Sequence, residues 1–347
     1  MKSANVRYLA PFETPFESDT HMANPSAGPV IVTGADGFVG SALAAQFVAT
    51  GRPFVAAVRR VPAGAAAKPH HRAVGDLATA SEAMLDELVA GAAAIVHLAG
   101  RAHVLADTAP DPGALYQAAN VVATERLAAA AVRAGVRRFV LASTVKVHGE
   151  ATTPGRPFRA DDPFAPHDAY ARSKVDAERA LAAIATGKPL DAIVLRLPLV
   201  YGPRVKGNFA TLLDAVAREA LLPFGGVANR RDLLYVGNLV HAISVLVDAP
   251  EAVRGAWLVA DGEAVATPEL VRRLAAALGV APRVPKVPPS LLTLAAAVTG
   301  RGALLRRTVS SLEVDASPLV RRIGALPFTF DQGLAATAAW WRLRHAI

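Results

Sequence analysis

The sequence predicts an α/β protein, with a doubly wound parallel sheet covered by helices on both faces and a smaller mixed α/β region after it. Short apolar runs alternate with longer helical stretches through the first part of the chain, which is typical of βαβ units. A glycine-rich turn follows the first apolar run directly. The chain has 347 residues, 52% of them hydrophobic, so it can bury a large core, and general disorder is excluded.

The apolar runs supply the expected strands, because strands buried on both faces are apolar almost throughout. In chain order, these strands are expected at residues 30–32, 54–58, 73–74, 93–98, 139–142 and 192–197. Helical stretches lie between them, the first ending near Thr50 and the others covering residues 79–89, 115–134 and 169–185. The crossovers between parallel strands should be right-handed.

After Leu197 proline and glycine interrupt the pattern, and the elements become less regular. We expect strands at 233–236 and 257–260, and helices at 238–247, from Thr267 onward and at 331–343. A proline in the first turn supports the helix that starts at Thr267. The expected organisation is a disordered extension over 1–27, a larger domain of 28–197 plus 228–250, and a smaller domain of 198–227 plus 251–347.

The chain is basic, with a net charge of +8 and a sequence pI near 10.1. Its basic residues are single or paired, and aromatic residues make up only 6%, so the stacking surfaces of nucleic-acid binders are not expected. The excess charge is therefore either a compositional bias or the property of a few arginines that bind small anions. Cysteine is absent, which excludes disulfides, thiolate nucleophiles and Cys-ligated zinc, and no metal site is expected.

No apolar run approaches the roughly 20 residues that span a bilayer, and residues 1–27 lack the apolar core of a signal peptide. A cytoplasmic protein is expected, and membrane association is not.

The segment from Thr33 to Gly40 follows the first strand and opens a helix. Glycines in such a turn let the backbone approach a pyrophosphate, which the free N–H groups of the helix N-terminus then bind. This placement predicts a Rossmann dinucleotide site, with a purely structural turn as the alternative. Its residues would be Gly34, Gly37, Phe38, Val39 and Gly40.

The end of the second strand distinguishes the two common dinucleotides. An acid there binds the ribose hydroxyl of NAD, whereas an arginine suits the phosphate of NADP. The strand ends in Arg59-Arg60, and no acid follows before Asp76, so NADP(H) is favoured and NAD stays possible. The alternative is that both arginines face solvent. Asp76 and Leu77 would lie at the adenine edge.

Tyr170 and Lys174 are four residues apart in a helical stretch, which places them on one face, one turn apart. A free phenol is a poor acid or base at neutral pH, but a nearby ammonium stabilises the phenolate. Ser143 and Thr144 end the fifth strand, where a hydroxyl can bind a developing oxyanion, although a Ser/Thr pair can also be a local cap.

Together these features resemble the extended short-chain dehydrogenases/reductases of the nucleotide-sugar epimerase/dehydratase group, over about residues 30–341. The resemblance also rests on Leu98-Ala99-Gly100, Asn120, the VYGPR stretch from Val200, Arg231 with the DLLYV stretch, and the final TFDQGL stretch. It implies that Tyr170 is the acid/base, Lys174 its partner and Thr144 the catalytic hydroxyl beside Ser143. The other implied cofactor contacts are Leu98, Ala99, Gly100 and Asn120, and the implied substrate contacts are Asn208, Phe209 and Arg231.

Several positions of this sequence differ from the family pattern, and the differences limit the reactions that we expect. In the dehydratases an Asp-Glu pair follows the catalytic Thr, but here these positions hold Val145 and Lys146, which argues against dehydration. Pro198-Leu199 replaces a stretch in which many 4-epimerases have Asn. His148 stands where Tyr is usual, and a packing role is favoured for it. The 287–305 stretch and the SLEVD stretch from Ser311 resemble a subgroup from bacterial polysaccharide loci.

Three functions follow as hypotheses. The first is an NADPH-dependent 4-keto reductase of a UDP-linked 6-deoxy-hexosamine for surface polysaccharide synthesis. The second is a UDP-hexose 4-epimerase that retains NAD⁺ and acts on UDP-glucose or UDP-N-acetylglucosamine. The third is a non-catalytic NADP-binding sensor. The resemblance also implies a nucleotide-diphosphate sugar as the ligand and a homodimer formed through the helices at 115–134 and 169–185.

Overall fold

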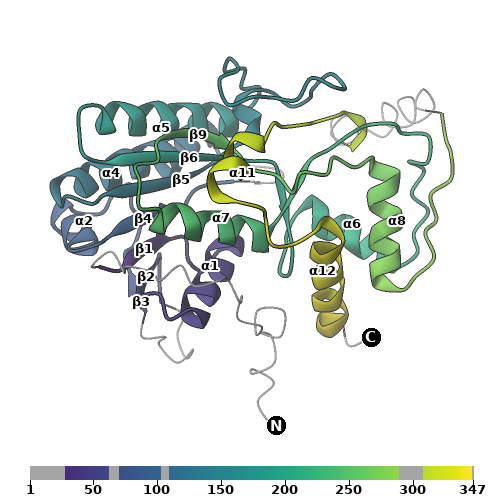
Figure 1. Ribbon diagram of the computed structural model, residues 1–347, viewed down its shortest axis with the longest axis horizontal. Helices are drawn as coiled ribbons and strands as arrows, with labels where there is room; N and C mark the ends of the chain where they lie inside the picture. Colours follow the sequence, from purple (N-terminus) through teal and green to yellow (C-terminus); the bar gives the residue numbers. More distant parts are fainter. Residues whose placement is uncertain (1–27, 62–69, 103–108, 289–307, 346–347) are drawn as a thin grey trace, which may run out of the picture. The chain divides into compact units, whose positions relative to one another are not determined.

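The computed structural model of the protein describes residues 28–61, 70–102, 109–288 and 308–345 (Figure 1). The extension expected at residues 1–27 and most of the 287–305 stretch lie outside the described residues. The chain divides into two compact units. The first contains residues 1–147, 166–196 and 240–257, and the second contains residues 148–165, 197–239 and 258–347.

A seven-stranded sheet forms the centre of the first unit, in the order β3-β2-β1-β4-β5-β6-β9. Its strands are β1 (Val30–Thr33), β2 (Phe54–Val58), β3 (His71–Ala73), β4 (Ala94–His97), β5 (Arg138–Thr144), β6 (Asp191–Leu197) and β9 (Gly255–Leu258). β1 pairs in parallel with both β2 and β4, β2 with β3, and β4 with β5. The α/β fold with a doubly wound sheet is therefore confirmed.

Helices cover both faces of this sheet (Figure 1). One layer contains α2 (Glu82–Val89), α4 (Ala123–Arg133) and α5 (Ala169–Ala185), and α1 (Phe38–Ala49) lies on the other face. The core under the first layer includes Ile31, Ile95, Leu127, Phe139 and Leu181, each 1% exposed or less. Burying one such side chain contributes about 1.5–3 kcal/mol to folding.

The long helix expected at residues 115–134 is interrupted. It consists of α3 (Pro112–Tyr116), a π-helical turn η1 (Gln117–Val122) and then α4. Such π-turns are often found at functional sites, and this one contains the buried Asn120. A helical hydrophobic period does not distinguish a π-turn from a regular turn, so the interruption could not be predicted.

The second unit combines a two-stranded parallel sheet with helices. Its strands are β7 (Leu199–Tyr201) and β8 (Leu233–Tyr235), and its helices are α6 (Asn208–Ala217), α8 (Thr267–Leu278), α11 (Ser317–Ile323) and α12 (Phe330–His345). The helix α7 (Val236–Asp248) begins in this unit and continues into the first. Tyr201 is fully buried and stacks on Phe209 at a centroid distance of 5.3 Å. Within the described ranges, no helix has the length and apolar character needed to cross a membrane.

Candidate functional site

The glycine-rich turn between β1 and α1 has no room for side chains at two of its glycines. Gly34 has a φ of 66°, and a Cβ there would lie 2.7 Å from the backbone nitrogen of Ala99. A Cβ on Gly40 would lie 2.2 Å from the carbonyl oxygen of Gly34. Gly37 is the N-cap of α1 and supplies no side-chain cap. The first N–H groups of α1, around Phe38 and Val39, can therefore bind a phosphate, as a dinucleotide site requires.

The predicted contacts Arg59, Asp76 and Leu77 follow the ends of β2 and β3. Arg59 and Arg60 come directly after β2 and are both exposed. Asp76 is exposed, and its carboxylate accepts a hydrogen bond of 3.0 Å from the backbone of Ala78, while Leu77 is buried. The exposed guanidinium groups can thus reach a ligand from solvent.

Asn120 connects the segment after β4 to the helix α5. Its Oδ1 accepts a 2.8 Å hydrogen bond from the backbone N–H of Arg101, and its Nδ2 donates to the carbonyl oxygen of Arg101 at 3.1 Å. The same Nδ2 donates to the hydroxyl of Ser173 at 2.9 Å. A Cβ on Gly100 would lie 2.8 Å from Asn120 Oδ1. Asn120 therefore holds the backbone at Arg101, directly after the predicted contacts Leu98, Ala99 and Gly100, and leaves no room for a side chain at Gly100.

Tyr170 and Lys174 lie one turn apart on α5, as their spacing predicts. The helix starts after Asp168, whose side chain caps it by accepting a 2.7 Å hydrogen bond from Ala171 N–H. Burial raises the pKa of Tyr170 to about 12, while the hydrogen bond between Tyr170 and Thr144 lowers it. Burial also lowers the pKa of Lys174 to about 8, and the charge of Glu178 opposes this change. Tyr170 is therefore a protonated phenol at neutral pH and can donate a proton.

The neighbouring hydroxyls at the end of β5 have different partners. Thr144 hydrogen-bonds Tyr170, and its Oγ1 also accepts a 3.3 Å hydrogen bond from Lys146 N–H. Ser143 donates its hydroxyl hydrogen to the carboxylate of Glu178. Both hydroxyls therefore contact α5, but at different residues: Thr144 meets Tyr170, and Ser143 meets Glu178 further along the helix.

An ion pair beside the tyrosine was not evident from the sequence. Lys146 Nζ lies 2.9 Å from Asp168 Oδ2, and both side chains are partly exposed. The carboxylate of Asp168 tends to raise the pKa of Tyr170, so the ammonium of Lys146 offsets a charge that disfavours the phenolate. Asp before a helical stretch is a recognisable N-cap signal, but its pairing with Lys146 depends on the fold.

The three predicted substrate contacts lie in the second unit. Asn208 begins α6 and is exposed, whereas Phe209 is buried in the stack with Tyr201. Arg231 donates a 2.8 Å hydrogen bond from Nη1 to the carbonyl oxygen of Ser310, and burial lowers its pKa. His148 belongs to the same unit and is 4% exposed, stacked on Phe158 at 5.5 Å, so it has a packing role.

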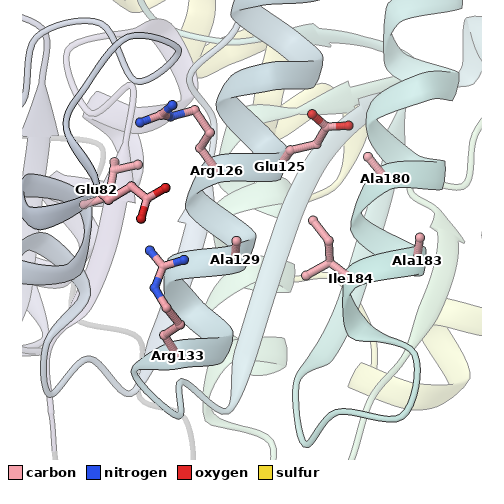
Figure 2. Close-up of a pocket in the computed structure, with 9 residues that line it drawn as sticks. Glu82, Glu125, Arg126, Ala129, Arg133, Ala180, Ala183 and Ile184 are labelled. Atoms are coloured by element: carbon pink, nitrogen blue, oxygen red, sulfur yellow. The ribbon is translucent and has the colours of Figure 1, made fainter.

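A hollow of about 410 Å³ lies on the outer helices of the first unit (Figure 2). Glu82 on α2 and Arg126 and Arg133 on α4 line one side, and the α5 residues Ala180, Ala183 and Ile184 line the other. It contains none of the predicted catalytic or cofactor residues. The homodimer expected through these helices stays a prediction.

Comparison with known proteins places these features in a family. A family model described as the NAD dependent epimerase/dehydratase family matches residues 30–260. The chain is 39% identical over 246 residues to a UDP-glucose 4-epimerase of Vibrio cholerae, an alignment covering 70% of this chain and 75% of the relative. It is 32% identical over 276 residues to a UDP-glucose 4-epimerase of Mycolicibacterium smegmatis, covering 76% of this chain and 86% of the relative.

A solved structure of MoeE5 in complex with UDP-glucose and NAD is similar to most of the chain. The TM-score is 0.71 at 28% identity, and the similarity covers 92% of this chain and 100% of MoeE5. The family model covers well over half of the chain, and the glycine turn and the Tyr170–Lys174 pair are found in the expected elements of the fold. The chain therefore belongs to the NAD-dependent epimerase/dehydratase family, as the resemblance to extended short-chain dehydrogenases/reductases predicted.

Proposed function

We propose that the protein catalyses hydride transfer at C4 of a UDP-linked hexose. The observation that carries this proposal is the set of Thr144, Tyr170 and Lys174, which a hydrogen bond and one helical turn bring together in the first unit. Tyr170 can exchange a proton with the sugar oxygen, Thr144 can donate a hydrogen bond to that oxygen, and Lys174 favours the phenolate.

A nicotinamide dinucleotide fits the first unit, because the glycine turn packs so closely at Gly34 and Gly40 that a Cβ would collide with backbone there, and it leads directly into the N-terminus of α1. When bound, it supplies the hydride acceptor or donor. The backbone of the turn and the N-terminus of α1 would hold its pyrophosphate. The solved structures of similar fold that contain NAD support this class of cofactor.

Elimination of water is not part of the proposal. Val145 and Lys146 occupy the positions that hold the Asp-Glu pair in the dehydratases. Val145 has no titratable group, and Lys146 is paired with Asp168. The residues after Thr144 are therefore compatible with hydride transfer at C4. They do not supply an acid or base for removing a neighbouring hydroxyl.

The first candidate is 4-epimerisation, which the names of the Vibrio cholerae and Mycolicibacterium smegmatis relatives support. For this step Tyr170 would have to be the phenolate that the charge of Lys174 favours, and it would accept the proton of the 4-hydroxyl as hydride leaves C4. The 4-keto sugar would then rotate in the site. Tyr170 would return the proton as hydride returns to the opposite face of the sugar. The cofactor would be NAD⁺, and it would be regenerated in each cycle.

The second candidate is reduction of a UDP-linked 4-keto-6-deoxy-hexosamine by NADPH. Arg59 and Arg60 favour it, because they directly follow β2, where an acid would bind the ribose of NAD. Tyr170 is protonated at neutral pH, so it could donate its proton to the 4-oxygen as hydride arrives at C4.

One experiment tests the proposal and separates the candidates. Purified protein is denatured, any released dinucleotide is identified, and fresh protein is incubated with UDP-glucose, UDP-N-acetylglucosamine or a UDP-4-keto sugar. Formation of the 4-epimer without net cofactor use supports epimerisation. Consumption of NADPH in equal amount with the 4-keto sugar supports reduction. If no UDP-hexose reacts with either cofactor, the proposed function is wrong.

Replacing Arg59 by Ala is expected to weaken NADPH binding by about 10- to 100-fold, because a charge-assisted contact to a phosphate contributes about 1.5–3 kcal/mol. NADH binding should change by less than about threefold, since NADH lacks the 2′-phosphate. Fluorescence titration of both cofactors measures this. Arg218→Ala removes an equally exposed charge elsewhere and should affect neither cofactor. An equal loss for NADPH and NADH in Arg59→Ala would remove the argument for NADP(H).

A further inference from the structure

Beneath the Tyr170–Lys174 pair lies a buried ion pair that the mechanism above does not use. Glu178 on α5 accepts hydrogen bonds from Arg196 on β6, from Nε at 3.1 Å and from Nη2 at 2.7 Å. Ser143 at the end of β5 donates its hydroxyl hydrogen to the same carboxylate. The side chains of Glu178 and Arg196 are 5% and 6% exposed. Three elements of the sheet and its helix layer thus meet at one carboxylate.

Glu178 also lies one turn beyond Lys174 on the same face of α5, because residues 170, 174 and 178 are spaced by four. The Lys174 side chain is 5% exposed, and its burial lowers its pKa to about 8, while Glu178 raises it. Among the described residues, Tyr170 lies one helical turn before Lys174, and the charge of Lys174 acts on His97. Burial raises the pKa of Tyr170 to about 12 and lowers that of His97 to about 3, so both are neutral at neutral pH and neither balances the ammonium.

We propose that Glu178 is a positioning residue that holds the buried Lys174 ammonium in its charged form, one helical turn after Tyr170. The inference rests on the proposed function in so far as Lys174 must be charged to favour the phenolate of Tyr170. Arg196 fixes the carboxylate of Glu178 through hydrogen bonds from Nε and Nη2, so the position of the negative charge is defined. The hydroxyl of Ser143 holds the Glu178 carboxylate beside the end of β5, where Thr144 also lies.

The network also explains why a buried charge is found on an otherwise alanine-rich helix. A buried carboxylate without partners would be strongly unfavourable, but Glu178 has a guanidinium, a hydroxyl and an ammonium around it. Because it faces two cations, its removal leaves both of them in a site of low polarity. The ammonium of Lys174 can then lose its charge by releasing a proton, whereas a guanidinium keeps its proton.

The test is a direct titration of Lys174 by NMR in protein labelled with ¹³C at the lysine ε-carbons. The chain has seven lysines, and Lys174→Met identifies the resonance. Glu178→Gln keeps the size of the side chain and removes its charge. It is expected to lower the titration midpoint of Lys174 by about one pH unit or more, a tenfold loss of proton affinity. The alkaline limb of kcat/KM should move to lower pH by the same amount.

Two further variants separate charge from structure. Glu178→Asp keeps the charge with a shorter stem, so the Lys174 midpoint should stay within about half a pH unit of the original value. It also keeps the test available if Glu178→Gln does not fold. Glu125→Gln makes the same chemical change at an exposed position of α4 and should leave the midpoint unchanged. A Lys174 midpoint that is the same in Glu178→Gln and in the parent, or that falls equally in Glu178→Asp, would overturn the proposal.

The titration needs no substrate, so it is independent of the proposed reaction. If the midpoint shifts as expected while no UDP-hexose is turned over, the proposed function fails and the assignment of Glu178 is supported. If UDP-hexoses react and the midpoint does not shift, the function stands and the role of Glu178 is only structural, which overturns the inference.

Discussion

Replacing Tyr170 by Phe is expected to reduce turnover by about 10²- to 10⁴-fold, because the variant loses the group that exchanges a proton with the sugar oxygen. Phe fills the same space on α5, so the fold and the affinity for the dinucleotide should change little. Steady-state kinetics with the substrate that the parent protein accepts measures the loss in kcat, and a cofactor titration measures binding.

Tyr116 provides a matched control, because its ring centroid lies 6.1 Å from that of Tyr170 and its side chain is buried. Tyr116→Phe removes a hydroxyl from the same region without removing the proton donor, and kcat should fall by less than about tenfold. If Tyr170→Phe kept the activity of the parent, or if the two variants lost equal activity, Tyr170 could not be the acid/base.

Replacing Gly34 by Ala is expected to destabilise the protein by about 2–5 kcal/mol and to abolish detectable dinucleotide binding. The left-handed φ of 66° costs an L-residue about 1–2 kcal/mol. The new Cβ would lie 2.7 Å from Ala99 N, and such overpacking costs about 1–3 kcal/mol. Relief of this contact would displace the turn that faces the pyrophosphate. Chemical denaturation and a cofactor titration measure the two effects.

Gly51 isolates the contribution of the close contact. It has the same φ of 66°, but a Cβ there would have nothing within 4 Å. Gly51→Ala should therefore cost only the conformational part, about 1–2 kcal/mol, and dinucleotide binding should be unchanged. Equal losses of stability and binding in the two variants would contradict the role given to the turn.

The sheet and the glycine turn could be predicted because both are local features of the sequence. Strands buried on both faces are apolar almost throughout, so runs such as 30–32 and 139–142 are visible without any knowledge of the fold. The spacing of Tyr170 and Lys174 likewise fixes their relation within one helix. These features need only a few neighbouring residues to be recognised.

Contacts between distant elements could not be predicted in this way. In the sequence, Glu178 is one acid on an alanine-rich helix and Arg196 one cation in an apolar strand, and each alone is typical of a solvated charge. Their pairing depends on the packing of α5 against β6. Ser143 and Thr144 are neighbours at the end of β5, but only the fold determines that Thr144 meets Tyr170 and that Ser143 meets Glu178.

The ion pair between Lys146 and Asp168 constrains any attempt to redesign the enzyme for elimination of water. Installing the Asp-Glu pair of the dehydratases at Val145 and Lys146 would replace a cation that lies 2.9 Å from Asp168 with a second carboxylate. Two neighbouring carboxylates cannot both ionise without mutual repulsion, and a new acid held in its protonated form would make a poor base. A successful design would therefore change Asp168 as well, to Asn or Ser, which keep the cap of α5 without its charge.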